Sequence, residues 1–397
     1  MLAYPIRLHD QEEAQRILES IDVEPCSVEI LSPKSQHLNI LIKSVKTSWA
    51  NIIKQEMLGS GGDAAISRSS YACKEAHTDV LMMGNISVLK RFVSKMRMQP
   101  DCFKVVADEV EKIITQNPVE IKIGQRTFDL SKDFIVIGIL NVTPDSFSDG
   151  GKFNDRDSAM RQVEKLLNDG ATVIDVGGES TRPDSMGVMT LEEMDRVIPI
   201  IEAIDKEFKP LISIDSNKPD VIEAALLAGA TLVNDVSSGN AVMSSVKAIN
   251  KWKASAIVMM NLTPNSYSGS STEEDLPDVI GTFMDFCISK RQKLMEQGIS
   301  NERLIFDPGI GFGLSDTDIG RLLKNMYSFT GSGLAVCSGL SRKSCLGRII
   351  GLGLSERDAL TNAISLSLMG QGVRIFRTHD AKGLADVIKF YKSIEGI

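Results

Sequence analysis

Hydrophobic residues in the carboxyl-terminal two thirds of the chain follow one repeated pattern. A short apolar run typical of a strand ends in polar or glycine residues, and a stretch with the spacing of an amphipathic helix follows. The apolar runs lie at residues 134–140, 172–177, 211–216, 232–236, 256–261, 304–309, 335–339 and 373–379. Strands that alternate with helices form a covered parallel sheet, and eight strands close a (β/α)8 barrel. The pattern therefore predicts an α/β TIM barrel within residues 118–397.

A doubly wound open sheet is the structural alternative, because it has the same alternation. It is less favoured, since no Gly-x-Gly-x-x-Gly segment follows the first predicted strand. Just before the barrel, residues 120–130 predict a hairpin that turns at Gly124 and Gln125 and closes the barrel floor.

Residues 1–117 carry a different pattern. Strands are predicted at 37–45 and 79–84, and helices at 47–59, 86–99 and 101–116. These elements indicate a separate, smaller α+β domain. The glycine-rich segment 59–67 lacks the Lys-Ser/Thr pair of a phosphate loop, so a turn between helix and strand is favoured.

Composition and net charge limit the classes of function that this protein can have. The chain has 397 residues, of which 43% are hydrophobic and 24% charged, as in a soluble enzyme with two domains. The net charge of −8, without a long Lys/Arg run, argues against nucleic acid or an anionic membrane as partner. The six cysteines show neither a CxxC pair nor zinc spacing, so reduced thiols are expected. Neither a signal peptide nor a membrane helix is indicated, and we expect a cytoplasmic protein.

Polar residues cluster at the predicted carboxyl ends of the strands, where such barrels carry their active sites. They are Asn141, Asp145, Asp175, Asp215, Asn234, Asp235 and Asp307. Any one of them could simply cap the following helix. Several carboxylates in one mouth would repel each other and lose hydration, which a ligand rich in N–H donors would offset. An aminopyrimidinone ring fits such a set of acceptors.

A second group of strand-end residues is cationic and consists of Arg182, Lys343, Arg377 and His379. The ends of strands 7 and 8 commonly bind an anion in such barrels. Arg377 and His379 are two residues apart on one strand, so they share a face and can reach one anion. The alternative is that His379 bonds only Asp380 or a backbone carbonyl.

The loops after the first two barrel strands are rich in Gly, Pro, Ser and Asp. Loops of this kind suit lids that close over a substrate. Two ordinary surface loops are the alternative, but Phe147 and the Thr181-Arg182 pair make it less attractive.

Seven segments stand in the order and spacing of one enzyme family. They are ILNVTPDSFSDGG, DVGGESTRP, ISIDS, VNDV, FDPGIGFG, GLSRKS and RTHD. From about residue 134 to 395 the chain resembles the dihydropteroate synthases. The resemblance implies a transferase of folate biosynthesis, inhibited by sulfonamides. It would join p-aminobenzoate to 6-hydroxymethyl-7,8-dihydropterin pyrophosphate and release pyrophosphate and 7,8-dihydropteroate.

The resemblance also implies roles for individual residues. The residues expected around the pterin ring are Asp215, Asn234, Asp307 and Lys343. The residues expected at the anion site are Thr181, Arg182, Arg377 and His379. Asn141 would ligate Mg²⁺ on the pyrophosphate, and Phe312 and Ser341 would shape the aminobenzoate pocket. If the C–O bond breaks early, Asp145 or Asp175 could favour the cation-like methylene that forms.

The chain departs from the family pattern at two positions. Members often carry a Met-His-Met segment after strand 5, whereas residues 258–262 here contain no His. A Lys often follows FDPGIGFG, and here Leu314 does. Both positions border the predicted pterin pocket, so we expect them to alter affinity more than the reaction.

Two other functions remain as alternatives. A methyltetrahydrofolate-dependent corrinoid methyltransferase would share the Asp/Asn grip on the pterin, but it has no use for a pyrophosphate site at Asn141, Arg377 and His379. A non-catalytic pterin-binding protein is the second alternative. The amino-terminal domain resembles the extension of longer family members, and structural support or a contact within a homodimer is the expected role. The motifs of a fused pterin kinase are absent from the sequence.

Overall fold

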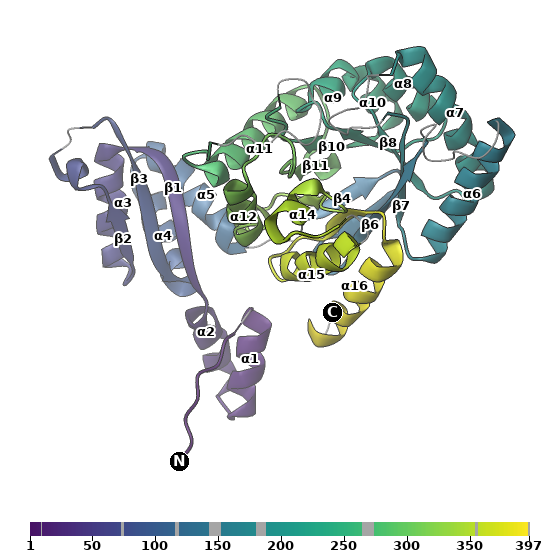
Figure 1. Ribbon diagram of the computed structural model, residues 1–397. Coiled ribbons are helices and arrows are strands. Elements are labelled where there is room, and N and C mark those ends of the chain that lie inside the picture. The colour runs from purple at the N-terminus through teal and green to yellow at the C-terminus, as the bar shows by residue number, and fades with distance from the viewer. Residues whose placement is uncertain are drawn as a thin grey trace. The chain divides into compact units, whose positions relative to one another are not determined.

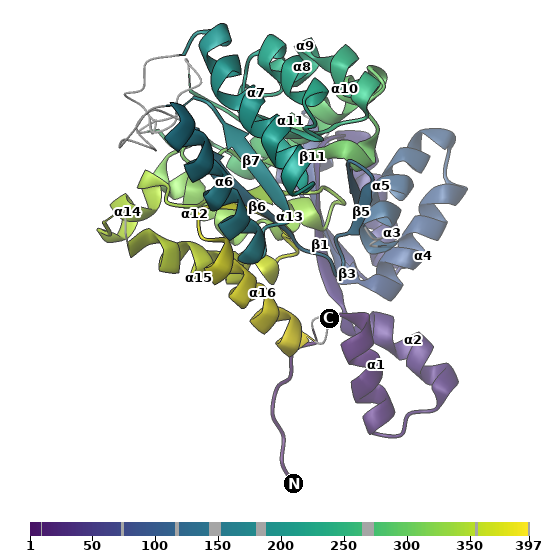
Figure 2. The same cartoon turned by 90° about the vertical axis from the view of Figure 1, so that its right-hand side faces the viewer.

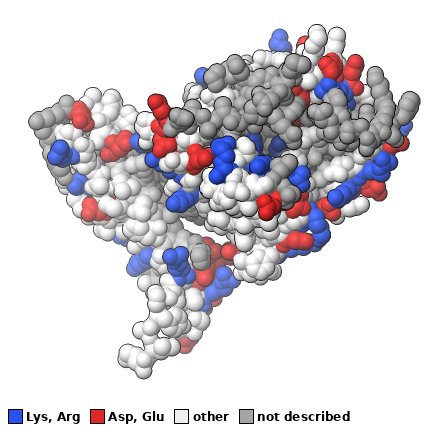
Figure 3. Space-filling view, viewed as in Figure 1, with Lys and Arg blue, Asp and Glu red and all other residues white. Residues whose placement is uncertain are grey.

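The computed structural model describes residues 1–8, 10–72, 75–115, 119–142, 152–179, 188–263, 274–353 and 356–395 of the chain. The chain divides into two compact units, Met1–Asn117 and Pro118–Ile397. None of the described helices is long and apolar enough to cross a membrane. Among the described residues on the face drawn in Figure 3, Lys and Arg side chains are interspersed with Asp and Glu.

The amino-terminal unit contains an antiparallel sheet in the order β1-β3-β2. Its strands are β1 (His37–Lys46), β2 (Asp63–Ile66) and β3 (His77–Asn85). Its helices are α1 (Gln11–Ser20), α2 (Pro25–Ser35), α3 (Thr47–Gly59), η1 (Arg68–Ala72), α4 (Ile86–Met98), η2 (Asp101–Phe103) and α5 (Lys104–Thr115). Helices α3 and α4 pack against the sheet and bury its apolar residues (Figure 1). The predicted α+β character is confirmed, whereas α1, α2 and β2 were not predicted.

The glycine-rich segment forms the turn that leads from α3 into β2. A Cβ atom on Gly62 would lie 2.7 Å from Val88 Cγ1 and 2.9 Å from the Met83 carbonyl oxygen. Glycine is therefore needed here for close packing against β3 and α4, which gives the segment a structural reason.

The second unit is built on a parallel eight-stranded sheet in the order β11-β10-β9-β8-β7-β6-β13-β12. The strands are β6 (Ile135–Asn141), β7 (Val173–Gly177), β8 (Leu211–Asp215), β9 (Leu232–Asp235), β10 (Ser255–Met259), β11 (Leu304–Asp307), β12 (Cys337–Ser338) and β13 (Ile375–Thr378). A parallel bridge between Phe306 and Val336 joins the two ends of this order. The sheet therefore closes, and the predicted barrel is confirmed over the open sheet.

Helices surround the barrel strands (Figures 1 and 2). They are α6 (Lys152–Asn168), α7 (Thr190–Glu207), α8 (Pro219–Leu227), α9 (Asn240–Ser244), α10 (Val246–Trp252), α11 (Val279–Glu296), η4 (Asn301–Arg303), α12 (Asp316–Lys324), α13 (Tyr327–Thr330), α14 (Ser344–Ile350), α15 (Arg357–Met369) and α16 (Ala381–Glu395). Their apolar faces and the outward strand residues form one continuous core.

The barrel floor is apolar and closed. The predicted hairpin exists as β4 (Glu120–Ile123) and β5 (Arg126–Asp129). Its Ile121, Ile123 and Phe128 side chains are at most 5% exposed. They pack against the first inward-facing residue of the barrel strands, including Ile135 and Val173. Because strand side chains alternate between faces, every second residue above this layer also points into the barrel.

Candidate functional site

That alternation explains how the predicted site residues come together. Above the apolar floor, the polar inward-facing residues of β6, β7 and β8 include Asn141, Asp175 and Asp215. The same parity selects Asn234 on β9, Asp307 on β11 and Arg377 on β13, with His379 two residues beyond Arg377. A Cβ atom on Gly177 would lie 3.8 Å from both Asn141 Oδ1 and Asp215 Oδ2, so three strand ends converge at this point.

Arg377 lies between two carboxylates inside the barrel. Its Nε donates to Asp175 Oδ2 at 2.6 Å, and one terminal nitrogen donates to Asp215 Oδ2 at 2.7 Å. The Asp175 side chain is fully buried, and that of Asp215 is 14% exposed. Arg377 thus supplies part of the compensation that the acids of the mouth require.

Burial and neighbouring charges have opposite effects on the pKa values of Arg377 and Asp215. Burial by itself lowers the pKa of Arg377, but the charges of Asp175 and Asp215 outweigh it and raise that pKa above its ordinary value. Burial raises the pKa of Asp215 to about 7, with Arg377 opposing and Asp175 and Glu193 adding to the rise. Arg377 is therefore a permanent cation, whereas Asp215 titrates near neutral pH.

Lys343 and Asp307 are a second pair of opposite charges at the mouth that influence each other without a direct ion pair between them. Lys343 Nζ lies 4.1 Å from the ring centroid of Phe312, a cation–π contact. Burial lowers the pKa of Lys343 to about 8, against the favourable charge of Asp307. Asp307 Oδ1 accepts the amide of Gly309 at 2.8 Å, and burial raises the pKa of this carboxyl. Phe312 itself is 2% exposed and packs against neighbouring apolar side chains.

The loop after β11 depends on Gly309. Its φ is +70°, and a Cβ atom there would lie 1.7 Å from the carbonyl oxygen of Met260. No other residue fits without moving the backbone. The glycine lets the loop pass close to the end of β10 and leaves Asp307 and Phe312 on either side of the turn.

Ser341 and His379 are paired. Ser341 Oγ lies 3.0 Å from His379 Nδ1 and also accepts the backbone N–H of His379 at 3.1 Å. These two contacts hold the imidazole beside Ser341 at the end of β13. Asp380 also caps α16, because its Oδ1 accepts the amide of Gly383.

The helix-capping alternative holds for Asp235. Its Oδ1 accepts the backbone N–H and the hydroxyl of Ser237, and its Oδ2 accepts the amide of Val242 in α9. The adjacent Asn234 faces the opposite side of the strand, toward the barrel interior, and is 6% exposed. Of the two polar residues that end β9, only Asn234 therefore points into the mouth.

Three predicted residues, Asp145, Thr181 and Arg182, lie outside the described residues, as does Phe147. The described residues that flank the second loop are Glu179 and Val188. Glu179 Oε1 accepts the amide of Val188 at 3.2 Å, so the two ends of this loop are joined at its base.

A part-buried charge cluster beside the mouth was not predicted. Lys218 donates to the carboxylates of Glu179 and Glu193, and Glu193 is fully buried. Its charge contributes to the raised pKa of Asp215. The sequence carries no signal for this cluster, because its members lie 25 and 39 positions apart on different elements.

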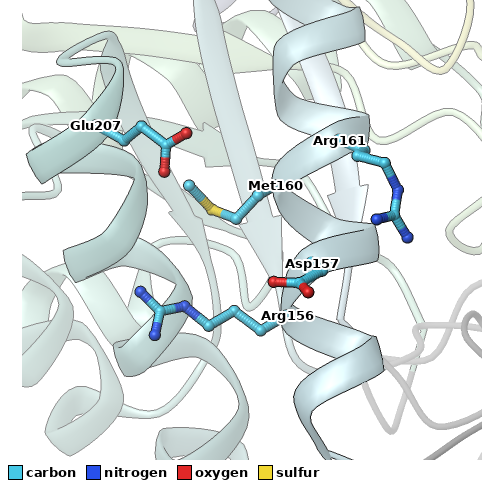
Figure 4. Close-up of a pocket in the computed structure, with 5 residues that line it drawn as sticks. All are labelled: Arg156, Asp157, Met160, Arg161 and Glu207. Atoms are coloured by element: carbon cyan, nitrogen blue, oxygen red, sulfur yellow. The ribbon is translucent and has the colours of Figure 1, made fainter.

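A pocket of about 340 Å³ lies elsewhere, between the outer helices α6 and α7. Figure 4 shows its lining residues, which are Arg156, Asp157, Met160, Arg161 and Glu207. None of them belongs to the strand-end group. The barrel mouth remains the candidate active site.

Comparisons with known proteins agree with this geometry. A family model described as "Pterin binding enzyme" matches residues 137–379. A dihydropteroate synthase of Streptococcus pyogenes serotype M3 is 37% identical over 270 residues, which cover 68% of this chain and 97% of the relative.

Two solved structures extend the likeness to three dimensions. A Xanthomonas albilineans dihydropteroate synthase with 4-aminobenzoic acid has a TM-score of 0.64 and 31% identity, and the match covers 71% of this chain and all of that one. A Burkholderia cenocepacia dihydropteroate synthase complexed with 7,8-dihydropteroate has a TM-score of 0.61 and 32% identity, and the match covers 70% of this chain and 97% of that one. The matches to these relatives do not cover the amino-terminal region of this chain. The chain belongs to the pterin-binding enzymes and, among them, to the dihydropteroate synthases.

Proposed function

We propose that the inward-facing residues of the barrel mouth carry out the synthase reaction in named roles. The reaction joins p-aminobenzoate to 6-hydroxymethyl-7,8-dihydropterin pyrophosphate and yields 7,8-dihydropteroate and pyrophosphate. One observation carries the proposal: Asp175, Asp215, Asp307, Asn234 and Arg377 all occupy inward-facing positions of their strands, above one apolar floor. A corrinoid methyltransferase has no comparable need for a cationic strand end beside the pterin acceptors.

The pterin ring is assigned to the deeper part of the mouth. The acceptors are Asp215, Asn234 and Asp307, whose oxygens suit the exocyclic amine and ring N–H groups of an aminopyrimidinone. Lys343 adds a donor from the loop after β12, the strand next to β11. Because Asp307 is 9% exposed and the Asp215 side chain 14% exposed, hydrogen bonds from the ring would replace hydration that both carboxylates have largely lost.

The pyrophosphate is assigned to His379 and Arg377, joined by Thr181 and Arg182 from the second loop. The charge that builds on the leaving group needs fixed cations and donors. Asp175 and Asp215 already hold the Arg377 guanidinium at 2.6 and 2.7 Å, so this cation is set in place before substrate binds. The Ser341 contacts do the same for the His379 ring.

Mg²⁺ is assigned to Asn141. The described residues contain no group of three His, Cys, Asp or Glu side chains that could hold a metal. Mg²⁺ keeps several waters and is commonly bound by one or two protein oxygens together with substrate phosphates, so one exposed amide at a strand end fits. When bound, Mg²⁺ would neutralise charge on the pyrophosphate.

The aminobenzoate is assigned to the region of Phe312 and Ser341. Its amine is neutral at pH 7 and needs no strong base. The C–O bond to pyrophosphate breaks early, a C–N bond to the amine forms, and the nitrogen then releases one proton. Asp175, and Asp145 from the first loop, would favour positive charge on the methylene. A large carbon isotope effect at the methylene, with inverted configuration, would instead indicate direct attack.

Assembly and location are also proposed here. A homodimer is supported by large apolar side chains exposed on α14 and α16, which are Ile349, Ile350, Phe390 and Ile394. We assign the amino-terminal unit, residues 1–117, to support of the barrel or a contact in that dimer, and the protein to the cytoplasm. Sedimentation of the full chain would test the dimer, and a monomer at micromolar concentration would contradict it.

Pyrophosphate release tests the function directly. The full chain is mixed with Mg²⁺ and the pterin pyrophosphate, with or without p-aminobenzoate and with or without a sulfonamide. We expect release that depends on p-aminobenzoate and is inhibited by the sulfonamide. Binding of the pterin without such release would support a non-catalytic pterin-binding protein instead.

A further inference from the structure

Arg342 has a backbone conformation that non-glycine residues rarely adopt. Its φ is +57°, in the left-handed region. It stands between Ser341, which contacts His379, and Lys343, which lies over Phe312. A single left-handed residue redirects the chain, so the conformation of Arg342 determines where its two neighbours point.

Asp358 binds the side chain of Arg342 through two hydrogen bonds. Arg342 Nε donates to Asp358 Oδ1 at 2.9 Å, and a terminal nitrogen donates to Asp358 Oδ2 at 2.7 Å. Two parallel bonds fix the guanidinium plane as well as its position. Arg357 adds a bond to the carbonyl oxygen of Arg342 at 3.2 Å, so α15 grips both the side chain and the backbone of this residue.

The Asp358 carboxylate is stable in its charged form. The hydrogen bond from Arg342 is the main reason that the pKa of Asp358 lies below its ordinary value, and the charges of Arg342 and His379 add to it. Asp358 lies in the first turn of α15, where a negative charge is favoured by the helix dipole.

We propose that Asp358 is a positioning residue: by clamping Arg342 in a left-handed turn, it sets Ser341 against His379 and Lys343 over Phe312. This inference rests on the proposed function for the meaning of those groups. Asp358 acts through Arg342 and is not assigned any contact with substrate.

Replacing Arg342 by glycine distinguishes the backbone conformation of this residue from the charge of its side chain. Glycine adopts positive φ about as readily as negative φ, so a chain with Gly at 342 has less need of the clamp. We expect Asp358→Ala to lower kcat/KM for p-aminobenzoate roughly 10- to 100-fold, the scale of a misplaced site group. Asp358→Glu should retain most activity, and the double variant Asp358→Ala with Arg342→Gly should regain activity relative to Asp358→Ala.

Two further measurements complete the test. Asp386→Ala removes an exposed carboxylate from α16 and serves as the matched control, with kinetics expected to equal those of the unaltered chain. The NMR signal of the His379 imidazole, assigned with His379→Asn, should shift in Asp358→Ala and move back in the double variant. Circular dichroism checks that each variant is folded.

Unaltered kinetics and an unaltered His379 signal in Asp358→Ala would overturn the proposal. So would an Arg342→Gly variant as impaired as Asp358→Ala with no recovery in the double variant, because the guanidinium itself would then be the required group. If the unaltered chain releases no pyrophosphate, the proposed function fails. The His379 signal then still decides whether Asp358 positions this segment.

Discussion

Arg377 on β13 donates from Nε to Asp175 on β7 at 2.6 Å, across the intervening strand β6. The contact joins two strands that do not pair with each other. It also fixes a permanent cation inside the mouth and leaves Asp175 Oδ1 buried without a hydrogen-bond partner among the described residues.

Removal of Arg377 should destabilise the barrel as well as stop the reaction. Arg377→Met leaves Asp175 and Asp215 without their shared cation, and breaking a buried ion pair costs about 3 to 5 kcal/mol. Urea unfolding should show this loss. Adding Asp175→Asn should recover part of it, because one of the uncompensated charges is removed. Equal stability of the single variant and the unaltered chain would contradict the buried network.

The raised pKa of Asp215 predicts a pH-dependent stability. Between its ordinary value of 3.8 and about 7, the folded chain keeps a proton on Asp215 that the unfolded chain has released. Unfolding then releases a proton, so the contribution of this group to the free energy of unfolding falls as pH rises, by at most about 1.4 kcal/mol per pH unit. Asp215→Asn should lack this component. Parallel stability curves for the two proteins from pH 4 to 7 would count against the shifted pKa.

The lowered pKa of Lys343 predicts selective acylation. With a pKa of about 8, roughly half of its amine is neutral at pH 8, against well under one per cent for an ordinary lysine. We expect limiting acylating reagent at pH 8 to modify Lys343 ahead of the exposed Lys382, whose pKa is raised. Peptide mass spectrometry measures both sites in one sample. A faster reaction at Lys382 would show that burial of the Lys343 amine outweighs its neutral fraction.

A pair of glycines separates steric clash from backbone strain. Gly309 and Gly333 have φ of +70° and +77°, but only a Cβ on Gly309 would collide, 1.7 Å from the Met260 carbonyl oxygen. Gly333→Ala should cost about 1 kcal/mol from the conformation alone. Gly309→Ala should cost about 1 to 3 kcal/mol more, from the overlap. Thermal unfolding of the two variants measures the difference, and equal losses would exclude the close approach.

The sequence alone predicted the features that depend on local periodicity. Strand alternation placed Arg377 and His379 on one face, and the order of the apolar runs indicated the barrel. The partners of Arg377 could not be predicted, because Asp175 and Asp215 lie 202 and 162 positions away and meet it only when the barrel closes.

Other misses have similarly specific causes. Lys218 precedes a proline in an ordinary loop, and its partner Glu193 lies on a helix where a glutamate is usually solvated. Helix α2 contains Pro33 in its interior, which argues against a helix. Strand β2 is only four residues long and follows a glycine-rich turn that masks its pattern.

The β4–β5 hairpin closes one end of the barrel. Its Ile121, Ile123 and Phe128 side chains fill the lower end, so substrates and products must enter and leave through the same opening at the mouth. If the pterin occupies the deeper position, it has to arrive before the aminobenzoate, and the aminobenzoate would otherwise bar its path. The closed lower end of the barrel, filled by three apolar side chains far from the reacting groups, would then impose the order in which the two substrates bind.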